Sequence, residues 1–80
     1  MTVDELAILP RLASLLGCHP RHVSIWSTPD MEAVPFKETL YLRHAGVTQS
    51  RTVLMRDAEE DPLCVISAYE EMARTVGVVS

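Results

Sequence analysis

The stretch TLYLRHAGVTQSRTVLMRD, residues 39–57, decides the fold because it has the pattern of a β-hairpin followed by an acidic segment that opens a helix. Leu40 and Leu42 alternate with Tyr41 and Arg43, which is the period of two that a half-buried strand requires. The run that follows the turn repeats this alternation. The sequence therefore predicts two antiparallel strands with one apolar face.

With the hairpin loop placed at residues 46–49, the apolar face carries two cross-strand pairs, Leu42 with Val53 and Leu40 with Met55. The pairs predicted on the other face are Tyr41 with Leu54, Arg43 with Thr52, and Thr39 with Arg56. Two strands alone are marginally stable in water, so the apolar face requires cover from the rest of the chain.

The first segment of that cover is an N-terminal helix. Residues 2–5, TVDE, have the form of a capping box, and the leucines and isoleucine of residues 6–16 fall on one side of a helix. Gly17 supplies a left-handed stop. Pro10 lacks an amide donor and clashes with the preceding turn, so we expect either a kink or two short helices that share the apolar face.

A C-terminal helix provides the second segment of cover. Pro62 suits the first turn of a helix, with Asp61 as its cap. The residues expected to be buried are Val65, Ile66, Ala68, Tyr69, Met72, Ala73 and Val76. Ser67, Glu70, Glu71 and Arg74 occupy the opposite side, and Gly77 is expected to end the helix.

Residues 22–28, HVSIWST, fit two interpretations. Val23 and Ile25 alternate with Ser24 and Trp26, which favours a strand. Alternatively, the spacing of small, turn and core residues in a helix-turn-helix motif is matched by Ala13, Gly17, Val23 and Trp26. Pro20 would then open the recognition helix of a DNA-binding transcription regulator. We favour the strand, because an acidic chain would offer few groups for holding DNA.

The predicted fold is a single α+β domain over residues 1–80, in the order α-β-β-β-α, with both helices on one face of a three-stranded antiparallel sheet. The middle strand should run from near Phe36 to His44, since Pro35 cannot donate to a ladder. This element order resembles that of double-stranded-RNA-binding domains. Their lysine-rich motif is replaced here by EEDPLC, residues 59–64, so RNA binding is not expected.

Composition bounds the function further. The 80 residues are 48% hydrophobic, which suits a globular domain, and the net charge of −4 has the wrong sign for a protein that holds nucleic acid through phosphates. Two cysteines are too few for a disulfide framework, and no leader peptide or membrane-crossing run is evident. We expect a cytoplasmic protein.

Metal binding and catalysis are not expected. Cys18, His19 and His22 are close in sequence, but a fourth ligand would have to come from His44 or Cys64, and no spacing signature links them. The same residues lack an orienting group or oxyanion device for nucleophilic catalysis. The sequence thus predicts a protein without enzymatic activity, cofactor or metal.

An acidic run precedes the last helix: Asp57, Glu59, Glu60 and Asp61. Carboxylates at a helix N-terminus are favoured by the helix dipole, so the run has a purely structural interpretation. Together with Glu70 and Glu71, however, the six carboxylates exceed what capping requires. They form an acidic patch suited to a basic protein partner.

The uncovered sheet face offers a second candidate surface. The residues expected there are Trp26, Tyr41, Arg43, Leu54 and Arg56, a mixture of aromatic and guanidinium groups that is enriched at interface centres. We include Tyr41 and Arg43 with the six carboxylates as partner-binding residues. Two free sheet edges, or packing through Trp26 and Tyr41, would also join two copies, so a homodimer is expected.

In size, charge and architecture the chain resembles the anti-CRISPR proteins of phages and prophages. These share no common motif, so no residue is assigned by alignment. The resemblance implies a stoichiometric inhibitor that binds a subunit of a CRISPR-Cas effector, of the type I Cascade class, and blocks target DNA binding. The alternatives are the helix-turn-helix regulator described above and a non-catalytic accessory subunit of a larger assembly.

Overall fold

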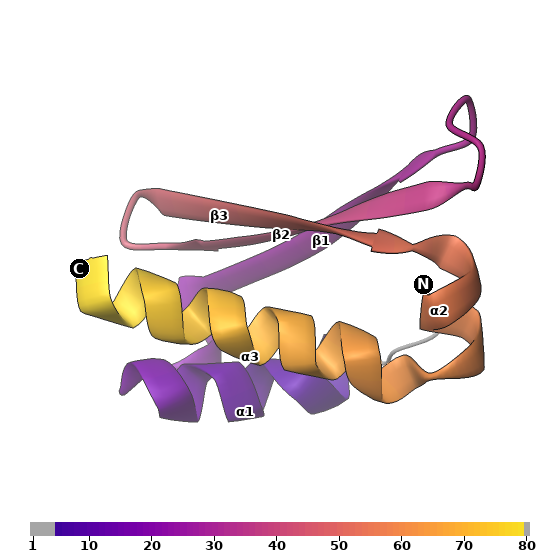
Figure 1. Cartoon of the computed structure of the whole chain (residues 1–80). Helices are drawn as coiled ribbons and strands as arrows, with labels where there is room; N and C mark the ends of the chain where they lie inside the picture. Colours follow the sequence, from indigo (N-terminus) through magenta and orange to yellow (C-terminus); the bar gives the residue numbers. More distant parts are fainter. Residues whose placement is uncertain (1–4, 80) are drawn as a thin grey trace.

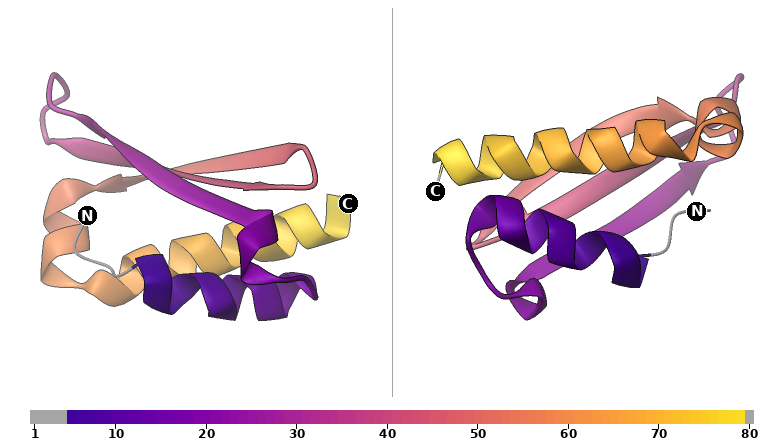
Figure 2. Two further views of the ribbon diagram at one scale, coloured as in Figure 1. Left: turned by 180° about the vertical axis from the view of Figure 1, so that it is seen from behind. Right: turned by 90° about the horizontal axis from the view of Figure 1, so that it is seen from below.

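A three-stranded sheet and a layer of helices make up the fold in the computed structural model, which describes residues 5–79 (Figure 1). The elements are α1 (Glu5–Leu16), a 3-10 turn η1 (Pro20–His22), β1 (Val23–Asp30), β2 (Lys37–His44), β3 (Val47–Leu54), α2 (Met55–Glu60) and α3 (Pro62–Val79). Helices α1 and α3 lie side by side under one face of the sheet and leave the other face open (Figures 1 and 2). The predicted α+β class and element order are confirmed.

The sheet is antiparallel throughout, with strand order β1-β2-β3. Residues 23–30 are strand β1, as favoured from the sequence, and no recognition helix exists there. Val23 and Ile25 are buried while Ser24 and Trp26 are exposed, so the alternation that indicated a strand also sets its two faces. The helix-turn-helix interpretation of this segment is therefore wrong.

The predicted hairpin register is wrong by four residues. The turn contains two residues, Ala45 and Gly46, with φ values of 52° and 78°, and His44 pairs with Val47. Positive φ at both central positions is the requirement of a type I′ turn, which suits the twist of a hairpin. Asn-Gly is the sequence typical of this turn, and Ala45-Gly46 does not predict it.

The shift changes every predicted cross-strand pair. Leu42 pairs with Gln49, Leu40 with Arg51, Tyr41 with Ser50, Arg43 with Thr48, and Thr39 with Thr52. Because the shift is an even number of residues, side chains remain on the predicted faces. Leu42 is fully buried and Arg43 is exposed, as expected, whereas Val53 is half-buried and Tyr41 is half-buried rather than exposed.

Helix α1 is one continuous helix that contains Pro10, so the second of the two alternatives expected at Pro10, a pair of short helices, is wrong. Its C-terminus follows the prediction: Gly17 has φ 69°, its N–H donates to Ser14 O (3.3 Å), and the Cys18 N–H donates to Ala13 O (3.0 Å). These are the two hydrogen bonds of a Schellman cap. Thr2, on which the predicted capping box depends, lies outside the described residues.

Two features near α3 differ from the prediction. Met55 and Arg56, expected in the hairpin, belong to the short helix α2, which the sequence analysis did not anticipate. Helix α3 also continues through Gly77 to Val79. A Cβ at Gly77 would lie 3.6 Å from Leu16 Cδ2, which is an ordinary van der Waals distance, so Gly77 lies inside the helix beside α1 and does not end it.

The core lies between the sheet and the two long helices. Its fully buried large side chains are Leu12, Leu40, Leu42, Val65, Tyr69 and Val76. Every residue expected on the buried side of α3 is buried or half-buried. Within residues 5–79, no helix combines the length and hydropathy of a transmembrane segment.

Candidate functional site

The charge of the chain is concentrated at one end of the molecule. We call residues 30–37 and 55–61 the acidic end: they comprise the β1–β2 connection with its flanking strand ends, helix α2, and the link to α3. Helix α2 lies beside this connection at the right of Figure 1. The acidic end contains six acids and two bases, namely Asp30, Glu32, Asp57, Glu59, Glu60 and Asp61 against Lys37 and Arg56. The rest of the chain has five acids and five arginines, so the acidic end carries the whole net charge of −4.

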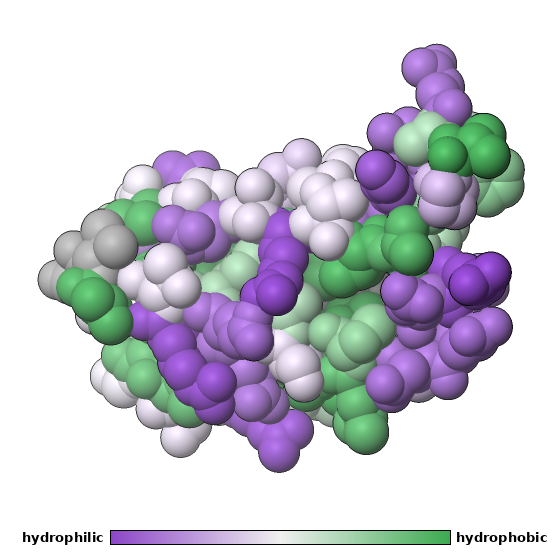
Figure 3. Space-filling view, in the orientation of Figure 1, coloured by the Kyte–Doolittle hydropathy of each residue, from purple (hydrophilic) through white to green (hydrophobic). Residues whose placement is uncertain are grey.

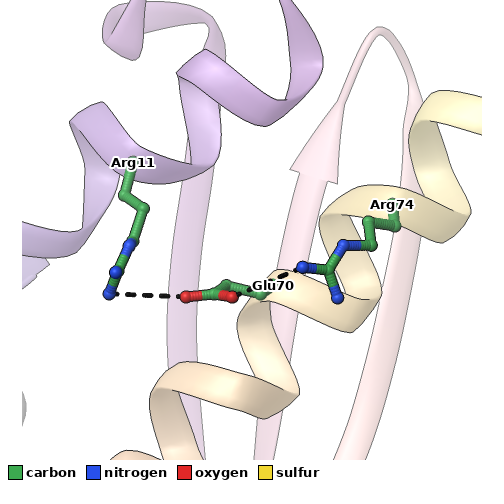
Figure 4. A network of polar contacts seen from close by, with 3 residues as sticks. All are labelled: Arg11, Glu70 and Arg74. Carbon is green, nitrogen blue, oxygen red and sulfur yellow. Dashed lines mark ion pairs between the residues drawn. The ribbon is translucent and has the colours of Figure 1, made fainter.

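All ion pairs in the described part of the chain lie outside the acidic end. Glu70 on α3 contacts two guanidinium groups, with Oε1 3.4 Å from Arg11 of α1 and Oε2 3.6 Å from Arg74 (Figure 4). Glu71 pairs with Arg51 of β3. The two glutamates predicted as part of the acidic patch are therefore already matched by basic groups of the same molecule.

The acidic run itself has few structural partners. Asp61 caps α3, since its Oδ1 accepts a hydrogen bond from the Leu63 N–H at 3.1 Å, which confirms the predicted cap. Asp57 lies in the first turn of α2. Glu59 and Glu60 are exposed in the last turn of α2, the end at which the helix dipole disfavours carboxylates. Capping therefore explains Asp61 but gives no reason for Glu59 and Glu60.

An apolar hollow of about 550 Å³ lies within the acidic end. Its lining comprises the apolar residues Met31, Val34, Pro35, Phe36 and Met55, together with the charged residues Arg56 and Glu59. Figure 3 shows apolar surface (green) on the β1–β2 connection at the upper right, below a hydrophilic tip and above the hydrophilic surface of the α2 region. Three large apolar side chains of this connection are exposed, which is unusual for so short a segment of a water-facing surface.

The β1–β2 connection is held by local hydrogen bonds. Asp30 Oδ1 accepts from the N–H groups of Glu32 (3.1 Å) and Ala33 (3.2 Å). At the other end of the connection, the Met55 N–H donates to Phe36 O at 3.0 Å and joins the segment to the start of α2. The hollow is thus built by two segments that the backbone fixes to each other.

The open sheet face carries Trp26 stacked on Tyr41, with ring centroids 5.2 Å apart and an interplanar angle of 9°. Arg43 lies on the same face near the hairpin turn. It is six residues from Lys37, which is about 20 Å along an extended strand. The predicted partner-binding residues therefore occupy three separate places: the acidic end, the ion pairs of α3, and the open face.

The cysteines and histidines do not assemble a metal centre. Cys18 Sγ lies 3.9 Å from His44 Nδ1, and the same nitrogen lies 3.0 Å from His22 O. No group of three or more potential ligands was found among the described residues.

A second hollow of about 400 Å³ lies between β3 and the helices and includes Cys64 among its lining residues. The ion-paired Arg51 and Glu71 also line it. Partial burial raises the pKa of the Cys64 thiol, as do the nearby carboxylates of Asp61 and Asp57, while a backbone hydrogen bond at Val65 acts in the opposite direction. A raised pKa lowers the thiolate fraction, so this cysteine lacks the activation typical of a nucleophile.

Sequence reasoning missed the apolar hollow. The available signal was the run of residues 31–36, MEAVPF, which places three large apolar side chains in a proline-containing connection. Met55 was assigned to the hairpin, and its contribution required knowledge that β3 ends at Leu54.

The chain matches no protein-family profile, no curated protein and no solved structure.

Proposed function

We propose that this protein is a stoichiometric, non-catalytic inhibitor that binds a basic, nucleic-acid-binding protein through the acidic end. The observation that carries the proposal is that the acidic end holds the whole net charge and forms no ion pair within residues 5–79, while the acids and bases of the rest of the chain are equal in number. Such a cluster attracts a surface of Lys and Arg side chains and speeds the encounter with it.

The partner class follows from what a basic surface normally holds. Lys and Arg side chains that bind DNA phosphates form a positive surface, and an acidic protein bound there would exclude DNA. The resemblance to anti-CRISPR proteins names a specific candidate, a subunit of a type I CRISPR effector complex. Asp57, Glu59, Glu60 and Asp61 would contact the groups that otherwise hold the target DNA.

The experiment is a competition assay in which a purified type I effector complex binds labelled target DNA in the presence of this protein. Two variants with equal net charge are compared: Glu59→Gln with Glu60→Gln at the acidic end, and Thr48→Lys with Ser50→Lys on the exposed hairpin. Both alter solvated positions, so the free energy of unfolding should change by about 0.5 kcal/mol or less.

The proposal expects the acidic-end variant to lose inhibition and the hairpin variant to keep it. Loss in the hairpin variant alone would assign binding to the open face around Tyr41 and Arg43. If the protein binds the effector complex without reducing DNA binding, it is an accessory subunit rather than an inhibitor. If it does not bind the complex at all, this partner is excluded.

A further inference from the structure

We propose that the apolar hollow of the acidic end is an anchor site for a partner segment in which a large apolar side chain is flanked by Lys or Arg residues. This inference deepens the proposed function and rests on it. It adds a second contact of different chemistry, and it predicts which kind of segment on a basic partner is recognised.

The hollow has the composition expected at the centre of a protein interface. Its lining is formed by aliphatic, thioether and aromatic side chains, and Val34 is 90% exposed. Interface hot spots combine a desolvated apolar centre with a polar rim. A volume of about 550 Å³ lies in the range of ~300–1,000 Å³ that is typical of ligand sites.

Charge complementarity selects the occupant. Glu59 lines the hollow itself, and Glu60, Asp57 and Glu32 lie in the same two segments, against the bases Arg56 and Lys37. A segment with acidic flanks would be repelled, and an uncharged segment would gain nothing from these carboxylates. A basic partner segment is attracted by the carboxylates around the hollow. Its apolar side chain loses contact with water when it enters the apolar centre of the hollow.

The test uses the full chain with ¹³C-labelled methionine methyl groups. Met31 and Met55 line the hollow, whereas Met72 is buried in the core and serves as an internal control. The probes are two synthetic peptides, Lys-Lys-Gly-Phe-Gly-Lys-Lys and its counterpart with serine in place of phenylalanine, titrated at physiological salt. We expect the phenylalanine peptide to move the Met31 and Met55 signals but not Met72, and to bind at least tenfold more tightly.

Two variants assign the effect to the hollow. Val34→Ser should reduce binding of the phenylalanine peptide severalfold and leave the serine peptide unchanged. Val78→Ser is the matched control, because Val78 is 88% exposed on α3 outside the acidic end. Glu59→Gln with Glu60→Gln should weaken both peptides.

Equal affinity for the two peptides with unmoved Met31 and Met55 signals would overturn the anchor site and leave the basic-partner function standing. Absence of binding by either peptide also overturns it, while the effector competition assay judges the proposed function independently. Movement of Met31 and Met55 on dilution of the protein alone would show that a second copy of the chain covers the hollow.

Discussion

Tyr69 and Trp26 join the two layers of the molecule. The Tyr69 hydroxyl, on the buried side of α3, donates a hydrogen bond to the main-chain carbonyl of Trp26 at 3.2 Å. Trp26 belongs to the edge strand β1, and its ring stacks on Tyr41 on the open face. One residue of an edge strand is therefore fixed from both faces of the sheet.

Tyr69→Phe should lower the free energy of unfolding by about 1 kcal/mol, because it removes one hydrogen bond and leaves the ring in place. Tyr41→Phe is the control and should cost less, since this residue is half-buried on the open face. Urea denaturation of both variants measures the difference. A cost for Tyr69→Phe no larger than that for Tyr41→Phe would contradict a stabilising role for the buried Tyr69 hydrogen bond.

Leu42→Ala should be more damaging than Tyr41→Ala, although the two residues are adjacent. Leu42 is fully buried, and large-to-small changes at such sites cost about 2–5 kcal/mol. Tyr41→Ala removes a ring stack that is worth about 0.5–1.5 kcal/mol in addition to its partial burial. Thermal melts that reverse this order would show that the faces of the sheet are interchanged.

Ala45→Asn should stabilise the protein by about 0.5–1 kcal/mol. Ala45 has φ 52°, a left-handed conformation that costs alanine about 1–2 kcal/mol and that asparagine adopts more readily. Gly46→Ala, at φ 78°, should destabilise the same turn. Chemical denaturation of both variants provides the check, and a loss of stability in Ala45→Asn would argue against the two-residue turn.

Cys64 should react slowly with iodoacetamide at pH 8. Its raised pKa, due first to burial and then to Asp61 and Asp57, lowers the thiolate fraction below that of a free cysteine. The rate is measured by mass spectrometry in a Cys18→Ser background. Asp57→Asn should increase the rate by removing one carboxylate, and a rate equal to that of a cysteine peptide in the parent protein would contradict the assignment.

Glu70→Gln should destabilise the protein by about 0.5–1 kcal/mol at low ionic strength and by less in 1 M salt. The Glu70 side chain is only 21% exposed. Its carboxylate contacts guanidinium groups from both long helices, and such ion pairs weaken as salt screens them. The matched control is Glu60→Gln, which removes an exposed carboxylate outside these ion pairs. Equal and salt-independent effects would contradict a role for the ion pairs.

The sequence pattern predicted which face of the sheet each side chain occupies better than it predicted which residues pair across the strands. Alternation at Leu40 and Leu42 correctly indicated which side of β2 is buried, because side-chain direction follows from strand geometry alone. The register between β2 and β3 depends on the length of the turn. Ala45-Gly46 does not predict a two-residue turn, whereas Asn-Gly would. Helix α2 was hidden because a six-residue helix with Ala58 as its single buried residue shows no periodicity.

The candidate site was predictable in its charges but not in its shape. The acidic run is contiguous in sequence, whereas the hollow combines residues 31–36 with Met55, and these meet only through tertiary structure. Glu70 and Glu71 appeared free because helix periodicity places them opposite the core. Their partners Arg11 and Arg51 belong to other elements, so no local pattern could reveal the pairing.

The uneven distribution of charge also affects how the protein approaches a charged surface of another molecule. Its longest extent is 37 Å, several times the Debye length of about 8 Å at physiological ionic strength. A surface near the hairpin turn is therefore screened from the four excess negative charges, while a surface near α2 experiences them directly. A positive surface exerts a torque that turns the α2 end toward it, so the protein arrives already oriented. If the protein binds a basic partner as proposed, the association rate should fall with added salt, and the lifetime of that complex should depend on the apolar contacts instead.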